Sequence, residues 1–129
     1  FGQHRAAEKT SAELEQAFGE LDAAIEATLQ AEERVEAALA ELDREAGRYG
    51  GVSFDALDME MDAAETMVLA HLVLTDAYRA IRHVEKPGVT DRALIGEARD
   101  AVEALEQQIP VLDELAEEIK EVTAELSRE

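Results

Sequence analysis

The feature that most constrains the fold is a seven-residue repeat of apolar side chains that runs through most of the chain. In a first segment, about residues 10–47, the repeat position holds Leu14, Leu21, Thr28, Val35, Leu42 and, just beyond it, Tyr49. Similar repeats follow over about 53–86 and about 90–127. Because residues three or four apart lie on one face of a helix, the repeat predicts three long amphipathic helices.

Two short connections separate these segments, one at Gly50 and Gly51 and one at Pro87 and Gly88. Short connections make successive helices antiparallel. The 129 residues are enough for one domain with its own core. We therefore predict an all-α fold: a single domain, residues 1–129, formed by an antiparallel, coiled-coil-like three-helix bundle with its termini at opposite ends.

Capping residues set the expected helix boundaries. Thr10 and Glu13 have the spacing of a capping box, and Ser53 and Thr90 are good N-cap residues for the second and third helices. Pro110 lies inside the third segment, where the apolar repeat continues without a slip. We therefore expect a kink at Pro110 and no break.

The repeat also predicts which side chains are buried. For the second helix the expected core residues are Phe54, Leu57, Met61, Ala64, Val68, His71 or Leu72, Thr75, Tyr78 and Ile81. For the third helix they are Leu94, Ala98, Ala101 or Val102, Leu105, Ile109, Leu112, Leu115 or Ala116, Ile119, Val122 and Leu126.

One stretch of the second helix, residues 67–74, is apolar in almost every position. Consecutive residues point in all directions around a helix, so a single neighbouring helix cannot cover all of these side chains. Either both flanking helices cover them, or some belong to a dimer or partner surface. The candidate interface residues are Met67, Leu69, Val73 and Leu74.

The net charge of −19 argues against partners that are themselves strongly negative. Phosphate backbones and anionic membrane surfaces select Lys and Arg, so we expect no binding to nucleic acid or to such a surface. The longest apolar patch, residues 67–74, is too short to span a bilayer, so we also expect no insertion into a membrane. Two explanations of the acidity stay open, adaptation to high salt and an ordinary acidic bundle.

A basic cluster stands out where the second helix ends and the third begins. It comprises Arg79, Arg82, His83, Lys86 and Arg92. Together with a helix N-terminus it could hold an anion or an acidic partner segment. Complementation of the helix dipole is the alternative explanation.

No motif indicates catalysis, a metal or a cofactor. The chain has no cysteine, and neither His71 nor His83 follows a glutamate at the spacing of a di-iron motif. The row Asp55, Asp58, Asp62 and Glu65 is typical of a solvated helix face. We therefore expect no enzyme activity, no metal and no cofactor.

These observations favour a non-catalytic interaction or scaffolding module that self-associates or binds partner helices. The alternative is a sensory bundle excised from a receptor, with a small ligand near His71, Tyr78 and Arg79. The sequence begins at Phe1 and not at a methionine, which suggests an excised domain or a processed product. The absence of cysteine leaves the compartment open, with the cytoplasm favoured over an extracytoplasmic domain of a larger protein.

Overall fold

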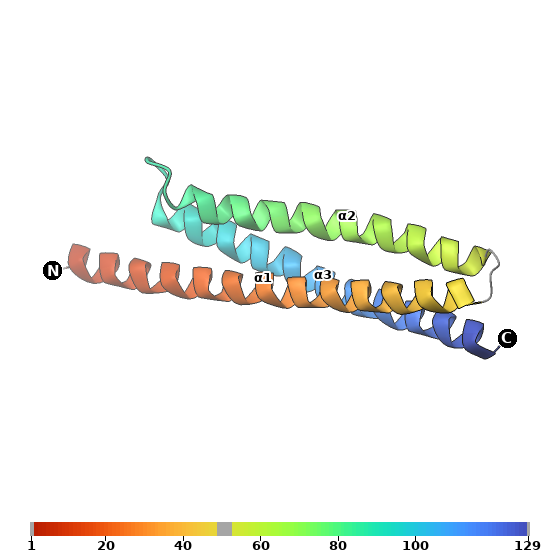
Figure 1. Ribbon diagram of the computed structural model, residues 1–129. Coiled ribbons are helices and arrows are strands. Elements are labelled where there is room, and N and C mark those ends of the chain that lie inside the picture. The colour runs from red at the N-terminus through yellow and green to blue at the C-terminus, as the bar shows by residue number, and fades with distance from the viewer. Residues whose placement is uncertain (1, 49–52, 129) are drawn as a thin grey trace.

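The computed structural model describes residues 2–48 and 53–128, which form three helices. They are α1 (Gly2–Arg48), α2 (Phe54–His83) and α3 (Asp91–Arg128). Successive helices run in opposite directions, so the start of α1 and the end of α3 lie at opposite ends of a long rod (Figure 1). The prediction of an all-α antiparallel three-helix bundle is confirmed.

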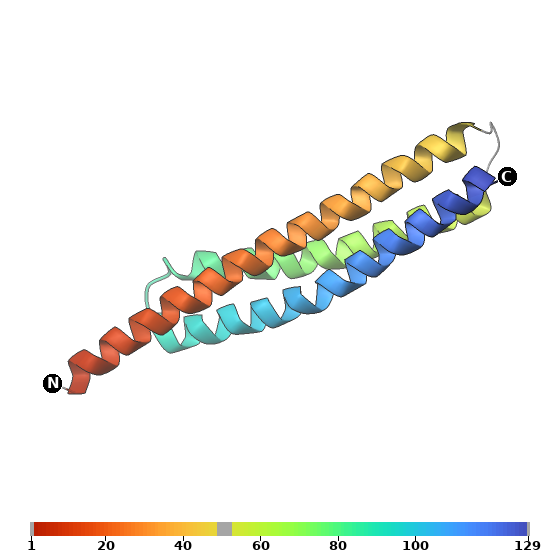
Figure 2. The ribbon, with the colours of Figure 1, turned by 90° about the horizontal axis from the view of Figure 1, so that it is seen from below.

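The first helix is longer than its capping residues predicted. It begins at Gly2, so Thr10 lies inside the helix and is not its N-cap. Ala6, Ala7, Glu8 and Lys9 are strong helix formers, and they continue the helix toward the N-terminus. This end of α1 projects beyond the other two helices (Figure 2).

The caps of α2 and α3 match the sequence. The Ser53 hydroxyl accepts a hydrogen bond from the Ala56 backbone N–H at 3.2 Å, and the Thr90 hydroxyl accepts one from Ala93 at 3.2 Å. α2 ends at His83, earlier than expected, because Pro87 disfavours helical backbone just before it. The repeat residue Tyr49 and the connection at Gly50 and Gly51 lie outside the described residues.

α3 continues without interruption through Pro110, as the unbroken apolar repeat predicted. It packs against α1 along most of the rod, and Arg34 joins Asp113 across this contact at 2.8 Å. The core residues expected on α1 and α3 are largely buried. The fully enclosed large ones include Leu21, Val35, Leu42, Leu105, Leu112 and Ile119.

The face that α2 turns toward the bundle differs from the prediction. Its buried residues are Ala56, Met59, Ala63, Ala70, Leu74, Ala77 and Ala80. Most of the expected core set faces water instead: Phe54, Leu57, Met61, Ala64, Val68, His71, Leu72, Thr75 and Tyr78 are exposed, and Ile81 is partly buried. The wide stripes of α1 and α3 fill most of the core between them, so α2 packs with a flat alanine face and keeps its larger side chains outside.

Candidate functional site

The most unusual surface of the molecule is the side of α2 that points away from the bundle. Ten large apolar side chains are exposed in the described residues, and seven of them are on this helix. We call these seven the α2 outer face: Phe54, Leu57, Met61, Val68, Leu69, Leu72 and Tyr78. Their exposed fractions run from 44% for Leu57 to 78% for Phe54.

The helix repeat brings these side chains together. Phe54, Leu57, Met61, Val68 and Leu72 follow one another at helical spacing, so they form a single stripe opposite the alanine face. Taking about 170 Å² for a fully exposed large apolar residue, the seven leave about 700 Å² of surface in water. The largest apolar patch of a typical monomer is about 300–600 Å². The α2 outer face therefore has the size of an interaction surface.

Charge is distributed unevenly along α2. Five acidic side chains precede residue 66 and no basic one occurs between Phe54 and Tyr78. Arg79 and Arg82 follow in the last turns, and Lys86 lies just beyond the helix. Asp76 and Glu85 lie close to these three, so the stripe is strongly acidic at its first end and has a small basic surplus at the other.

A polar contact between a buried carboxylate and an exposed imidazole joins α1 to α2 midway along the rod. Glu32 on α1 is 5% exposed, and one of its carboxylate oxygens lies 3.2 Å from Nδ1 of His71. The same Nδ1 lies 2.7 Å from the Met67 carbonyl oxygen. Both neighbours of Nδ1 are acceptors, so this nitrogen carries a proton and donates it. Burial raises the pKa of Glu32 above its ordinary value, His71 lowers it, and the Glu36 charge raises it. The other Glu32 oxygen, Oε1, is buried without a hydrogen bond in the described structure.

A second acidic contact lies nearer the loop between α1 and α2. A hydrogen bond with the Asp43 side chain raises the pKa of Glu60, and partial burial and the Asp43 charge act in the same direction. Two carboxyl groups form such a bond only when one is protonated. This one contact is therefore more favourable when Glu60 is protonated.

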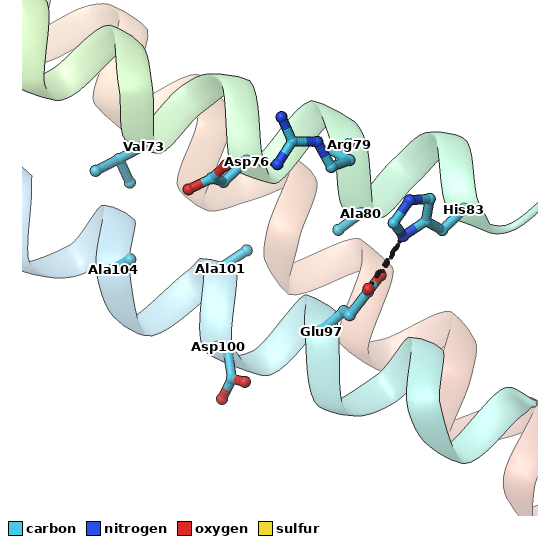
Figure 3. A pocket seen from close by; sticks show the side chains of 9 residues that line it. All are labelled: Val73, Asp76, Arg79, Ala80, His83, Glu97, Asp100, Ala101 and Ala104. Atoms are coloured by element: carbon cyan, nitrogen blue, oxygen red, sulfur yellow. Dashed lines mark hydrogen bonds and ion pairs between the residues drawn. The ribbon is translucent and has the colours of Figure 1, made fainter. Parts of the chain in front are cut away.

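A shallow pocket of about 290 Å³ lies between α2 and α3 near the other loop (Figure 3). Val73, Ala80, Ala101 and Ala104 give it an apolar lining, and its charged residues are Asp76, Arg79, His83, Glu97 and Asp100. Within it, Arg79 bonds to Asp76 at 3.2 Å and His83 Nδ1 donates to Glu97 at 2.9 Å. Three carboxylates against one guanidinium and one imidazole give a field that does not favour an anion.

The structure separates the basic residues that the sequence grouped together. Arg79 and His83 line the pocket, whereas Arg82, Lys86 and Arg92 are exposed and are not part of its lining. The ligand position suggested near His71, Tyr78 and Arg79 is also divided, because only Arg79 reaches the pocket.

The four interface candidates have three different environments. Leu69 is exposed and belongs to the α2 outer face, while Met67 and Val73 are partly buried and pack against the core. Leu74 is 4% exposed, so it lies in the core and not on an exposed surface. It lies on the inner side of α2, where it packs with Ala77, Ile95 and Ala98.

Sequence reasoning missed most of the α2 outer face because it assigned the largest apolar side chains to the core. A competing signal was present. Ala56, Ala63, Ala70 and Ala77 recur every seven residues, which marks a second stripe on the same helix.

No family model, curated protein or solved structure matches the chain. Within the parts of the chain that the structure describes, carboxylates and imidazoles form no group suited to holding a metal ion. Over the same residues, no helix has both the length and the apolar character needed to cross a bilayer.

Proposed function

We propose that this protein is a non-catalytic helical interaction module that uses the α2 outer face to bind an amphipathic helix of a protein partner. The observation that carries this proposal is the exposed stripe of seven large apolar side chains on one helix. Burying about 700 Å² of it corresponds to about 17 kcal/mol of gross stabilisation at about 25 cal/mol per Å². Only the part that exceeds the cost of association appears as affinity.

The pattern of the stripe favours a helix as the bound element. Spacings of three and four residues form the holes into which side chains of a second helix insert. Leu69 and Tyr78 widen the stripe on its two sides, and Phe54 extends it to the first turn of α2. From Phe54 to Tyr78 the stripe presents about 36 Å of contact, taken at about 1.5 Å per residue.

The remaining surface restricts which partners can approach. α1 and α3 carry 12 and 11 acidic residues against five and four basic ones, whereas α2 carries six against two. Electrostatic repulsion disfavours the approach of another acidic surface to α1 or α3. The apolar stripe on α2 therefore stands out as the favoured docking position.

The test uses a variant that shortens the stripe without changing the charge. Val68→Ser together with Leu72→Ser alters side chains that are 59% and 58% exposed, so the fold should be retained. Leu29→Ser together with Val111→Ser is the matched control on α1 and α3, where exposure is 39% and 46%. The probe is a synthetic amphipathic helix with leucine at heptad positions a and d and lysine at e and g.

We expect the probe to bind the native protein and the control equally, as measured by fluorescence anisotropy. The stripe variant should bind at least about tenfold more weakly, because two anchoring contacts of about 1 kcal/mol or more are lost. Equal binding by all three proteins would mean that charge alone attracts the probe, and the proposal would be abandoned.

A further inference from the structure

We infer that the partner helix is α2 of a second copy of this chain, bound antiparallel across the α2 outer face. The inference rests on the proposed function and names the occupant of the same surface. It follows from the charge along α2, the area of the stripe and its position on the outside of the bundle.

Charge decides the direction. In an antiparallel pair, the acidic first half of one α2 lies beside the basic end of the other, where Arg79, Arg82 and Lys86 gather. In a parallel pair, the four exposed acidic side chains that precede residue 66, which are Asp55, Asp58, Asp62 and Glu65, would lie near the same four in the second copy. Like charges placed opposite one another are destabilising.

Area supports a pair of this kind. Complete burial of the stripe in both copies would remove at most about 1,400 Å² of apolar surface from water, within the range of a standard stable interface of about 1,200–2,000 Å². A two-fold axis also makes the surface self-complementary, since each copy contributes the same side chains. α2 lies at the outside of the rod, so α1 and α3 of either copy leave the stripe accessible (Figure 1).

The register follows from placing acidic and basic ends together. Pairing Asp58 of one copy with Arg79 of the other puts the two-fold axis between Val68 and Leu69, at the centre of the stripe. Arg79 forms an ion pair with Asp76 at 3.2 Å, and these two side chains are 57% and 71% exposed. The Arg79 guanidinium is therefore accessible to a carboxylate of the second copy.

Cysteine cross-linking tests the direction without background, because the chain contains no cysteine. In the antiparallel register, Met61→Cys of one copy lies opposite Asp76→Cys of another, and Leu69→Cys lies beside itself. Two Met61→Cys positions would be about 22 Å apart, being 15 residues out of register, which is too far for a disulfide. We expect disulfide dimers from the mixture of the Met61 and Asp76 variants and from the Leu69 variant alone.

A charge exchange provides the second measurement, made by sedimentation at about 0.15 M salt. Asp58→Arg alone and Arg79→Asp alone should each weaken self-association about fivefold, because each repeats a like-charge contact twice across the axis. Mixing the two variants should restore association, since each new charge then meets its opposite. A variant at the exposed Asp100, changed to arginine, is the control for net charge alone.

The outcomes separate this inference from the proposed function. Self-linked Met61→Cys dimers, or no recovery on mixing the charge variants, would overturn the antiparallel pair. A protein that sediments as a monomer, yet binds the synthetic helix through Val68 and Leu72, would overturn the second copy and leave the proposed function standing. A monomer whose helix binding ignores these residues would overturn both.

Discussion

Enlarging the inner face of α2 should unfold the protein more readily than truncating its outer face. Ala70 is 0% exposed and Leu72 is 58% exposed, although only two positions separate them. Ala70→Leu adds three carbon atoms to a closely packed contact, and overpacking of this kind costs about 1–3 kcal/mol. Leu72→Ala removes atoms that are already largely in water and should change stability by no more than about 0.5 kcal/mol.

Urea unfolding followed by circular dichroism measures both free energies of unfolding. Each variant should be measured at two protein concentrations, so that any contribution from self-association is visible as a difference between them. For a chain of this size, Ala70→Leu should also lower Tm by about 4–10 °C. The reverse pattern, with a loss of about 2–5 kcal/mol for Leu72→Ala and none for Ala70→Leu, is that of a buried leucine and would refute the assigned face of α2.

Three further predictions concern pH, capping and salt. Because Asp43 raises the pKa of Glu60 in the folded state, the associated stability is present below the unfolded pKa and is lost as pH rises through the folded value. Tm should therefore increase as pH falls toward the ordinary glutamate pKa of about 4.3, and Glu60→Gln should flatten that increase. Ser53→Ala removes the acceptor of the Ala56 N–H and should cost about 1 kcal/mol in urea unfolding, whereas Ser11→Ala, inside α1, should cost far less. Raising KCl from about 0.1 to 1 M should raise Tm by screening the net charge of −19, and a flat response would show that self-repulsion is not the main destabilising force.

The two helices whose apolar repeat has one dominant stripe were predictable from the sequence. On α1, Leu21, Val35 and Leu42 have no rival face of comparable size, and all three are fully buried. Ser53 and Thr90 were also predictable, because a hydroxyl three residues before a free N–H is a local feature that needs no tertiary information.

α2 was not predictable in the same way, because it carries two stripes. Hydrophobicity favours burial of Phe54 and Met61, whereas close packing favours burial of Ala63 and Ala70. Which stripe faces inward depends on the space that α1 and α3 leave, and no property of residues 54–83 alone contains that information. The candidate site was missed for the same reason, since its residues are the ones that local hydrophobicity assigns to the core.

Alanine at every seventh position makes the inner face of α2 nearly symmetric under translation. A shift of one heptad, about 10 Å along the rod, would replace Ala63 by Ala70 or Ala56 with no change in shape. The contact between Glu32 and His71 breaks this symmetry, because the same shift would leave a buried carboxylate facing Ala64 or Tyr78. The polar pair thus acts together with Met59 and Leu74, the larger side chains of the inner face, to fix the position of α2 along its neighbours. It also fixes the point on the rod at which the α2 outer face is displayed.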